Sequence, residues 1–136
     1  MSVKTFPTFD KTHATTVVAT APIKANRLVS FNGTHAKASP EMGNGDLVIG
    51  VSETDAAIGE AFAATTGYSA LVEAGAAIPR GVYVCPAQDS SGRVEQGGLG
   101  LGISLCGIAR TAATAPGQLI EVVLLPHMTS GLPEGG

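Results

Sequence analysis

The sequence predicts an all-β fold, a small antiparallel β-barrel or sandwich of which a jelly roll is one form. Turn-forming residues interrupt the chain at short intervals, with 18 Gly and 8 Pro among 136 residues. The apolar runs between these turns are short and rich in β-branched residues, as is typical of strands. No long segment shows the periodicity of an amphipathic helix. At this length the chain is most simply one domain.

Internal repetition is the third observation behind this prediction. Gly50–Glu60 resembles Gly107–Gln118 with one residue inserted, and Ala21–Val29 resembles Ala76–Val84. We therefore predict two related β units, at about residues 15–66 and 67–126. The alternative is that similar phrases arise by chance, because Gly, Ala and Thr are frequent throughout the chain.

Strands are expected where an apolar or β-branched run lies between turn signals. In order, these are Thr15–Ala21, Arg27–Phe31, Leu47–Val51, Tyr68–Glu73, Gly81–Cys85, Arg93–Glu95, Gly102–Ala109 and Leu119–Leu125. Asn32-Gly33 is a hairpin signal, because both residues tolerate a positive φ. Ala56–Thr65 is ambiguous: its alanines permit a short helix, whereas Gly59, which aligns with Gly117, favours a turn into a strand.

The two ends of the chain carry no such pattern. Residues 1–14 are polar apart from isolated apolar side chains that include Phe6, Pro7 and Phe9, so we predict an extended N-terminal arm. An arm of this kind could be disordered or could lie in a groove on a partner. Residues 127–136 predict a flexible C-terminal tail without regular structure.

Composition excludes several classes of partner. Charged residues make up 14% of the chain and the net charge is −3, and the basic residues are scattered, so no basic stripe predicts nucleic-acid binding. The N-terminus lacks the apolar core of a signal peptide, and no apolar run is long enough to span a membrane. We expect synthesis in a reducing cytoplasm. Low charge also suggests that other subunits cover part of the surface, although a compact globule that needs no partner is the alternative.

No combination of residues predicts catalysis, a cofactor or a metal site. The glycines of Gly97–Gly102 fit no nucleotide-binding register and predict a flexible hairpin tip. Ser104 is displaced by one position from a nucleophile elbow. The remaining candidates have simpler explanations. We expect surface imidazoles at His13, His35 and His127, and solvated loop carboxylates at Glu53, Asp55 and Glu60. We expect small buried hydrophobes at Cys85 and Cys106, and a turn at the sequon Asn32-Gly33-Thr34. We predict that the protein is not an enzyme.

Several of these elements, in their order, resemble the capsid decoration, or head cement, proteins of tailed bacteriophages. The similarity covers about residues 15–125 and is carried by Ala77–Val84, Ser91–Val94, Gly107–Ala109 and Pro116–Val122. The matching positions imply scaffold roles for Ile78, Gly81, Val84, Gly107, Gly117 and Val122. Each element alone is a sequence pattern common to many β-turns and strands, so the resemblance depends on the order and spacing of the elements.

The resemblance implies a small all-β virion protein on the outer surface of an icosahedral capsid, made in the host cytoplasm. Its partners would be the major capsid protein and further copies of itself, in a homotrimer rather than a homodimer. It would bridge capsid subunits, stabilise the DNA-filled head and have no catalytic residues.

The arm and the tail depart from the family pattern, so they leave the contact surface open. We expect Phe6, Pro7 and Phe9 to dock on a neighbouring subunit, with Leu132 and Pro133 as weaker candidates. Two other functions remain open at this point. One is a small β-barrel module that binds a ligand such as a glycan, and the other is a hydrolase with an unusual site.

Overall fold

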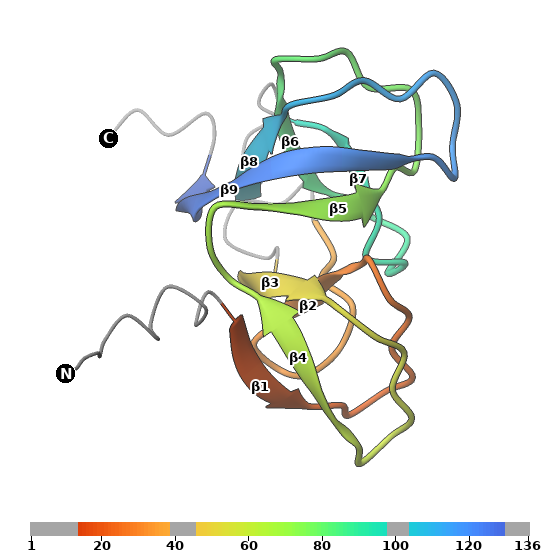
Figure 1. The fold of residues 1–136 in the computed structure, drawn as a ribbon, viewed down its shortest axis with the longest axis vertical. Helices are drawn as coiled ribbons and strands as arrows, with labels where there is room; N and C mark the ends of the chain where they lie inside the picture. The colour runs from red at the N-terminus through yellow and green to blue at the C-terminus, as the bar shows by residue number, and fades with distance from the viewer. Residues whose placement is uncertain (1–13, 39–45, 98–103, 130–136) are drawn as a thin grey trace, which may run out of the picture.

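A computed structural model describes residues 14–38, 46–97 and 104–129 of the protein. Within these residues the fold is all-β, as predicted, with nine strands in two antiparallel sheets. Figure 1 shows the two sheets lying one against the other. The sheets do not close on themselves, so the architecture is a sandwich and not a barrel. Among the described residues no helix is long and apolar enough to cross a membrane.

Each sheet comes from one half of the chain. The N-terminal sheet has the order β1 (Ala14–Val18), β4 (Ala61–Thr65), β3 (Val48–Ser52) and β2 (Leu28–Ser30). The C-terminal sheet has the order β5 (Ser69–Glu73), β9 (Leu119–Thr129), β8 (Ser104–Ala109), β6 (Tyr83–Pro86) and β7 (Val94–Gln96). The first four strands of the second sheet therefore repeat the order of the first sheet, and β7 is an addition at the edge.

The duplication extends to individual hydrogen bonds. Ile23 and Ala56 exchange both backbone hydrogen bonds in the N-terminal unit, and Ile78 and Ala113 do so in the C-terminal unit. We call two positions equivalent when they occupy the same place in the two units, as Ile23 and Ile78 do. The repetition in the sequence is therefore a repetition of structure, and the fold consists of two related β units.

The ambiguous stretch at Ala56–Thr65 is a turn followed by strand β4. Gly59 has a φ of 90° and its equivalent Gly117 a φ of 91°, a left-handed conformation that favours glycine. The side chain after each glycine closes the turn: Glu60 Oε1 accepts the N–H of Ala57 at 2.8 Å, and Gln118 Oε1 accepts the N–H of Thr114 at 2.7 Å.

A second pair of glycines allows a close approach between strands. A Cβ on Gly50 would lie 2.3 Å from the carbonyl oxygen of Thr65, and a Cβ on Gly107 would lie 2.4 Å from that of Val123. Register shifts occur beside each glycine, between Val29 and Ser30 opposite β3 and between Leu105 and Gly107 in β8. Both repeated phrases therefore begin with a glycine because no side chain fits there.

The two units do not share the core equally. The smaller cluster belongs to the N-terminal unit and consists of Val17, Ala19, Ile23, Val29, Ala56, Phe62 and Ala64. The larger cluster holds the equivalent side chains of the C-terminal unit and also takes Leu28, Ala36 and Val51 from the N-terminal unit. One face of the N-terminal sheet is therefore buried against the C-terminal unit.

Two sequence predictions need correction. Strand β9 continues through His127 to Thr129, where it pairs with the start of β8, so the first part of the predicted tail is regular structure because β8 extends far enough to pair with it. At Asn32-Gly33 only Gly33 adopts a positive φ, of 83°. Residues 1–13 of the predicted arm, the glycine-rich stretch at 98–103 and residues 130–136 lie outside the described residues.

Candidate functional site

The predicted contact residues are not among those that the structure describes. Phe6, Pro7, Phe9, Leu132 and Pro133 all lie outside the described ranges, so their role stays a prediction. His13 and most of the Gly97–Gly102 run lie outside as well. Strands β8 and β9 include Ser104 and His127, of which only the backbone is described.

The loop carboxylates have structural partners. Glu53 Oε2 accepts the hydroxyl of Thr65 at 2.9 Å, Asp55 Oδ1 accepts the N–H of Ala25 at 2.8 Å, and Glu60 closes its turn. All three residues are exposed, as the sequence predicted, and each carboxylate also fixes a turn or a strand end. Among the described residues no group of three His, Cys, Asp or Glu side chains could hold a metal ion.

His35 is more constrained than the surface imidazole that the sequence predicted. Its Nε2 accepts the backbone N–H of Lys24 at 3.1 Å. Burial lowers the pKa of His35 below its usual value of 6.5, and the charge of nearby Arg27 lowers it further. The imidazole is therefore held in the neutral form, in which it can accept this hydrogen bond.

The two cysteines are free and buried, which confirms the prediction that they act as small hydrophobes. Burial raises the pKa of Cys85 to about 11, and it raises the pKa of fully buried Cys106 further still. The Cys106 thiol faces the carbonyl oxygen of Val84 at 3.6 Å. Neither thiol forms a thiolate near neutral pH, so neither is a candidate nucleophile.

A cluster of charges joins the two units. Arg27 of the N-terminal unit and Arg93 of the C-terminal unit both contact Glu73, at 3.3 Å and 2.7 Å. Arg27 also donates to the carbonyl oxygen of Ser91 at 2.7 Å. The Nε atoms of both arginines are buried without a hydrogen-bond partner among the described residues. Removing Glu73 would therefore leave two guanidinium groups at the junction without their counter-charge.

Backbone hydrogen bonds join the same surfaces. Asn26 covers the outer edge of β5: its carbonyl accepts the N–H of Glu73 at 2.9 Å, and its Nδ2 donates to the carbonyl of Leu71 at 3.1 Å. The N–H of Leu28 donates to the carbonyl of Gly92 at 2.7 Å. Gly92 has a φ of 75° and lies so close to Leu28 that a Cβ would be 2.8 Å from its carbonyl oxygen.

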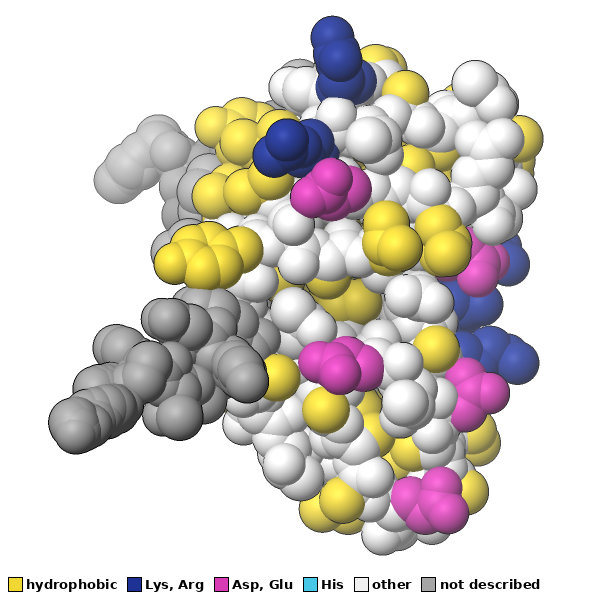
Figure 2. All heavy atoms as spheres, viewed as in Figure 1, with side chains coloured by type: hydrophobic (Ala, Val, Ile, Leu, Met, Phe, Trp, Pro, Cys, Tyr) yellow, Lys and Arg dark blue, Asp and Glu magenta, His cyan; other side chains and the backbone are white. Residues whose placement is uncertain are grey.

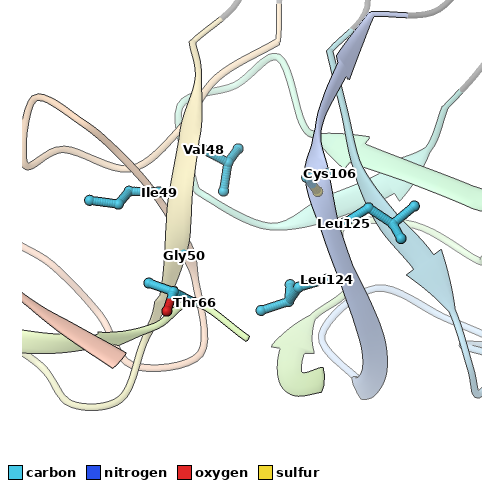
Figure 3. Close-up of a pocket in the computed structure, with 7 residues that line it drawn as sticks. All are labelled: Val48, Ile49, Gly50, Thr66, Cys106, Leu124 and Leu125. Atoms are coloured by element: carbon cyan, nitrogen blue, oxygen red, sulfur yellow. The ribbon is translucent and has the colours of Figure 1, made fainter. Parts of the chain in front are cut away.

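The clefts between the sheets do not resemble a ligand pocket. Figure 3 shows an apolar cleft where β3 meets β9, with Val48 and Leu124 on its two walls. Its volume of about 30 Å³ is room for little more than water. A larger cleft of about 380 Å³, with polar and apolar residues in its lining, lies beside His35, Lys37 and Asp46. Neither lining includes a Phe or Tyr side chain on which a sugar ring could stack.

The outer face of the C-terminal sheet is the more informative surface. Tyr83 on β6 is 44% exposed and pairs with partly exposed Ile108 on β8, which pairs in turn with partly exposed Val123 on β9. Figure 2 shows apolar side chains gathered over β8 and β9 on this face. Sequence reasoning missed this row because Tyr83, Ile108 and Val123 occur in runs that look wholly buried. The signal lay in the repeat, which aligns Tyr83 with Leu28.

Comparison with known proteins identifies the group to which this arrangement is similar. A family model described as "Phage cement protein" matches residues 8–124. Among solved structures, the head fiber gp8.5 N base of bacteriophage phi29 matches with a TM-score of 0.56 and 18% sequence identity. That match covers 82% of this chain and 92% of the phi29 chain, and it shows a shared fold. A search of curated proteins finds no match.

Proposed function

Because the chain belongs to the phage cement protein family, and so is a structural protein of the phage head, we propose that it binds the outer surface of an icosahedral capsid. In this proposal it bridges neighbouring major capsid subunits and stabilises the DNA-filled head. The observation that carries the proposal is the family match, which spans both β units.

The described chemistry supports a role in binding rather than catalysis. The loop carboxylates and His35 are engaged in hydrogen bonds, and the two thiols are buried. What the described residues offer to a partner is surface, including exposed apolar side chains on both units. A surface of this kind suits a protein that acts by contact.

Stabilisation would follow from mass action. A protein that binds only the assembled shell adds its binding free energy to the cost of separating the shell's subunits. Modest contacts are enough when many copies act on one lattice and each oligomer engages several sites. We propose a homotrimer in preference to a homodimer, since three copies can engage more capsid subunits at once.

We further propose a division of labour along the chain. Residues 14–129 form the body, from the start of β1 to the end of β9, while the arm at 1–13 and the tail at 130–136 reach neighbouring subunits. Within them Phe6, Pro7 and Phe9 provide the main contact, and Leu132 and Pro133 a weaker one. Deleting residues 1–13 should leave the body folded, because β1 begins at Ala14, and should weaken binding to capsids. Unchanged occupancy on particles would rule the arm out.

The test of the function compares phage heads with and without the protein. Heads that lack it should lose DNA at lower temperature and under milder osmotic shock, and adding purified protein back should restore their resistance. The proposal fails if bare heads survive heat and osmotic shock as well as decorated heads do.

A further inference from the structure

The edges of the two equivalent strands β1 and β5 differ in what covers them. The hydrogen-bond alternation of an antiparallel pair turns the backbone groups of Leu71 and Glu73 away from β9, and Asn26 of the other unit meets both. The equivalent groups on β1 are the carbonyl of Thr16 and the N–H of Val18. Among the described residues no hydrogen-bond partner meets either of them. The edge is covered just beyond them, because Gly33 lies against the carbonyl oxygen of Val18 and its own carbonyl accepts the N–H of Thr20 at 3.0 Å.

The sheet faces that carry Leu28 and its equivalent Tyr83 also differ in what covers them. Leu28, two residues after Asn26, is completely buried, because the face of the N-terminal sheet that carries it packs on the C-terminal unit. The equivalent residue of the C-terminal unit is Tyr83, which is 44% exposed. Val51, the strand partner of Leu28, is 2% exposed, whereas the equivalent Ile108 is partly exposed. Each unit thus has one surface that matches half of the junction but meets no partner within the described part of the chain: the uncovered part of the β1 edge in the N-terminal unit and the Tyr83–Ile108 face in the C-terminal unit.

The β1 edge and the Tyr83–Ile108 face carry apolar side chains at the positions where the junction within the chain carries charged ones. Inside the chain Arg27 pairs with Glu73. The positions equivalent to this pair are Val82 and Val18, and Val18 is 55% exposed. The uncovered part of the β1 edge, at the carbonyl of Thr16 and the N–H of Val18, has no charge and no proline, so it is a template for pairing with another chain. An exposed valine, an exposed tyrosine and free backbone groups are what a contact between copies requires.

We propose that a second copy of this chain docks here, with the β1 edge of one copy on the Tyr83–Ile108 face of the next. The contact repeats between chains the junction that already joins the two units within a chain. Continuity with that junction selects a second copy over a capsid segment as the occupant. The contact is head to tail, so it uses different surfaces on the two copies and builds a ring where the rotation closes.

The inference deepens the self-association in the proposed function, but it needs no capsid. Its test is the oligomeric state of the purified protein, measured by sedimentation across a range of concentrations. The wild-type chain should form a closed oligomer. V18K and Y83K should each weaken association about 30-fold or more, since each places a charge without a partner in the contact. Both side chains are exposed, so both variants should fold, which circular dichroism would verify.

A head-to-tail contact also predicts how a mixture of the two variants should assemble. In a mixture of V18K and Y83K chains, the intact Val18 of one variant can meet the intact Tyr83 of the other, so dimers should form but not closed oligomers. The control is L119K, because Leu119 is 50% exposed on β9 and lies outside the proposed contact; it should assemble as the wild type does.

Several results would overturn the inference: a monomeric wild-type chain, V18K or Y83K chains that assemble normally, or a mixture that stays monomeric. Loss of assembly on deleting residues 1–13, with V18K and Y83K unaffected, would assign the contact to the arm instead. Capsid binding by a monomeric wild-type chain would refute this contact and leave the proposed function standing. A head-to-tail oligomer that binds no capsid would do the reverse.

Discussion

The N-terminal and C-terminal units have the same strand order and the same turns, yet they occupy different environments. Leu28 of the N-terminal unit is completely buried at the junction, whereas its equivalent Tyr83 is 44% exposed. The edge of β5 is covered by Asn26, whereas no described residue caps the equivalent groups on β1. The two units therefore share one backbone pattern, while the burial of equivalent side chains differs between the N-terminal and the C-terminal unit. Features that both units share maintain the fold, and features that differ show where each unit meets a neighbour.

The glycines shared by both units should produce the largest effects. Gly50→Ala and Gly107→Ala should each lower the free energy of unfolding by about 3 kcal/mol or more, because the new Cβ would collide with the backbone of the next strand. Urea unfolding would measure the loss. Gly59→Ala is the control, since it has only a positive φ to accommodate and no atom within 4 Å, and it should cost about 1 kcal/mol. Equal losses at Gly107 and Gly59 would contradict the close strand approach.

The equivalent pair Leu28 and Tyr83 tests the difference in burial. Leu28→Ala should cost about 3 kcal/mol, because it leaves a cavity at the junction between the units. Tyr83→Ala, measured at concentrations where the chain is monomeric, should cost less than about 1 kcal/mol. Thermal and urea unfolding of both variants would give the comparison. Similar losses of stability at the two positions would contradict the different burial of Leu28 and Tyr83.

The charged junction should give a smaller effect. Glu73→Gln should destabilise the protein by about 2 kcal/mol, because Arg27 and Arg93 lose their common carboxylate while partly buried. Glu121→Gln is the matched control: its partner Arg110 is 67% exposed, so the change should cost no more than about 0.5 kcal/mol. If both variants unfold alike, the Glu73 cluster contributes nothing beyond a surface ion pair.

The smallest effect should come from the pH dependence of His35. Its pKa is lowered in the folded state, so the unfolded chain binds this proton more readily than the folded chain does. Stability should therefore be complete above the unfolded pKa of about 6.5 and should decline as the pH falls from there through the folded pKa. Unfolding curves across this range should show the decline, and His35→Gln should flatten it. An identical slope in the variant would assign the dependence to other groups.

Much of this fold was predictable because backbone geometry constrains particular residues. Gly50 and Gly107 leave no room for a side chain, and Gly59 and Gly117 hold a left-handed turn; these glycines made the repeat visible. The coverage of β5 by Asn26 was not predictable, because it depends on how two units pack and not on local sequence. The different burial of Leu28 and Tyr83 was hidden for the same reason, since both are apolar residues at one strand position.

The candidate site was less accessible to sequence reasoning than the fold. Glu53 and Asp55 looked like free loop charges because their hydrogen-bond partners, Thr65 and Ala25, lie on other segments. The predicted contact residues, such as Phe6 and Leu132, lie outside the described residues. The exposed row at Tyr83 and Ile108 became visible only when each position was compared with its equivalent in the other unit.

The most direct test of the account is an image reconstruction of phage heads to which purified protein has been added. The account predicts added density on the outside of the shell, with each oligomer in contact with at least two major capsid subunits. Density confined to the interior, contact with a single subunit only, or no added density at saturating protein would contradict it.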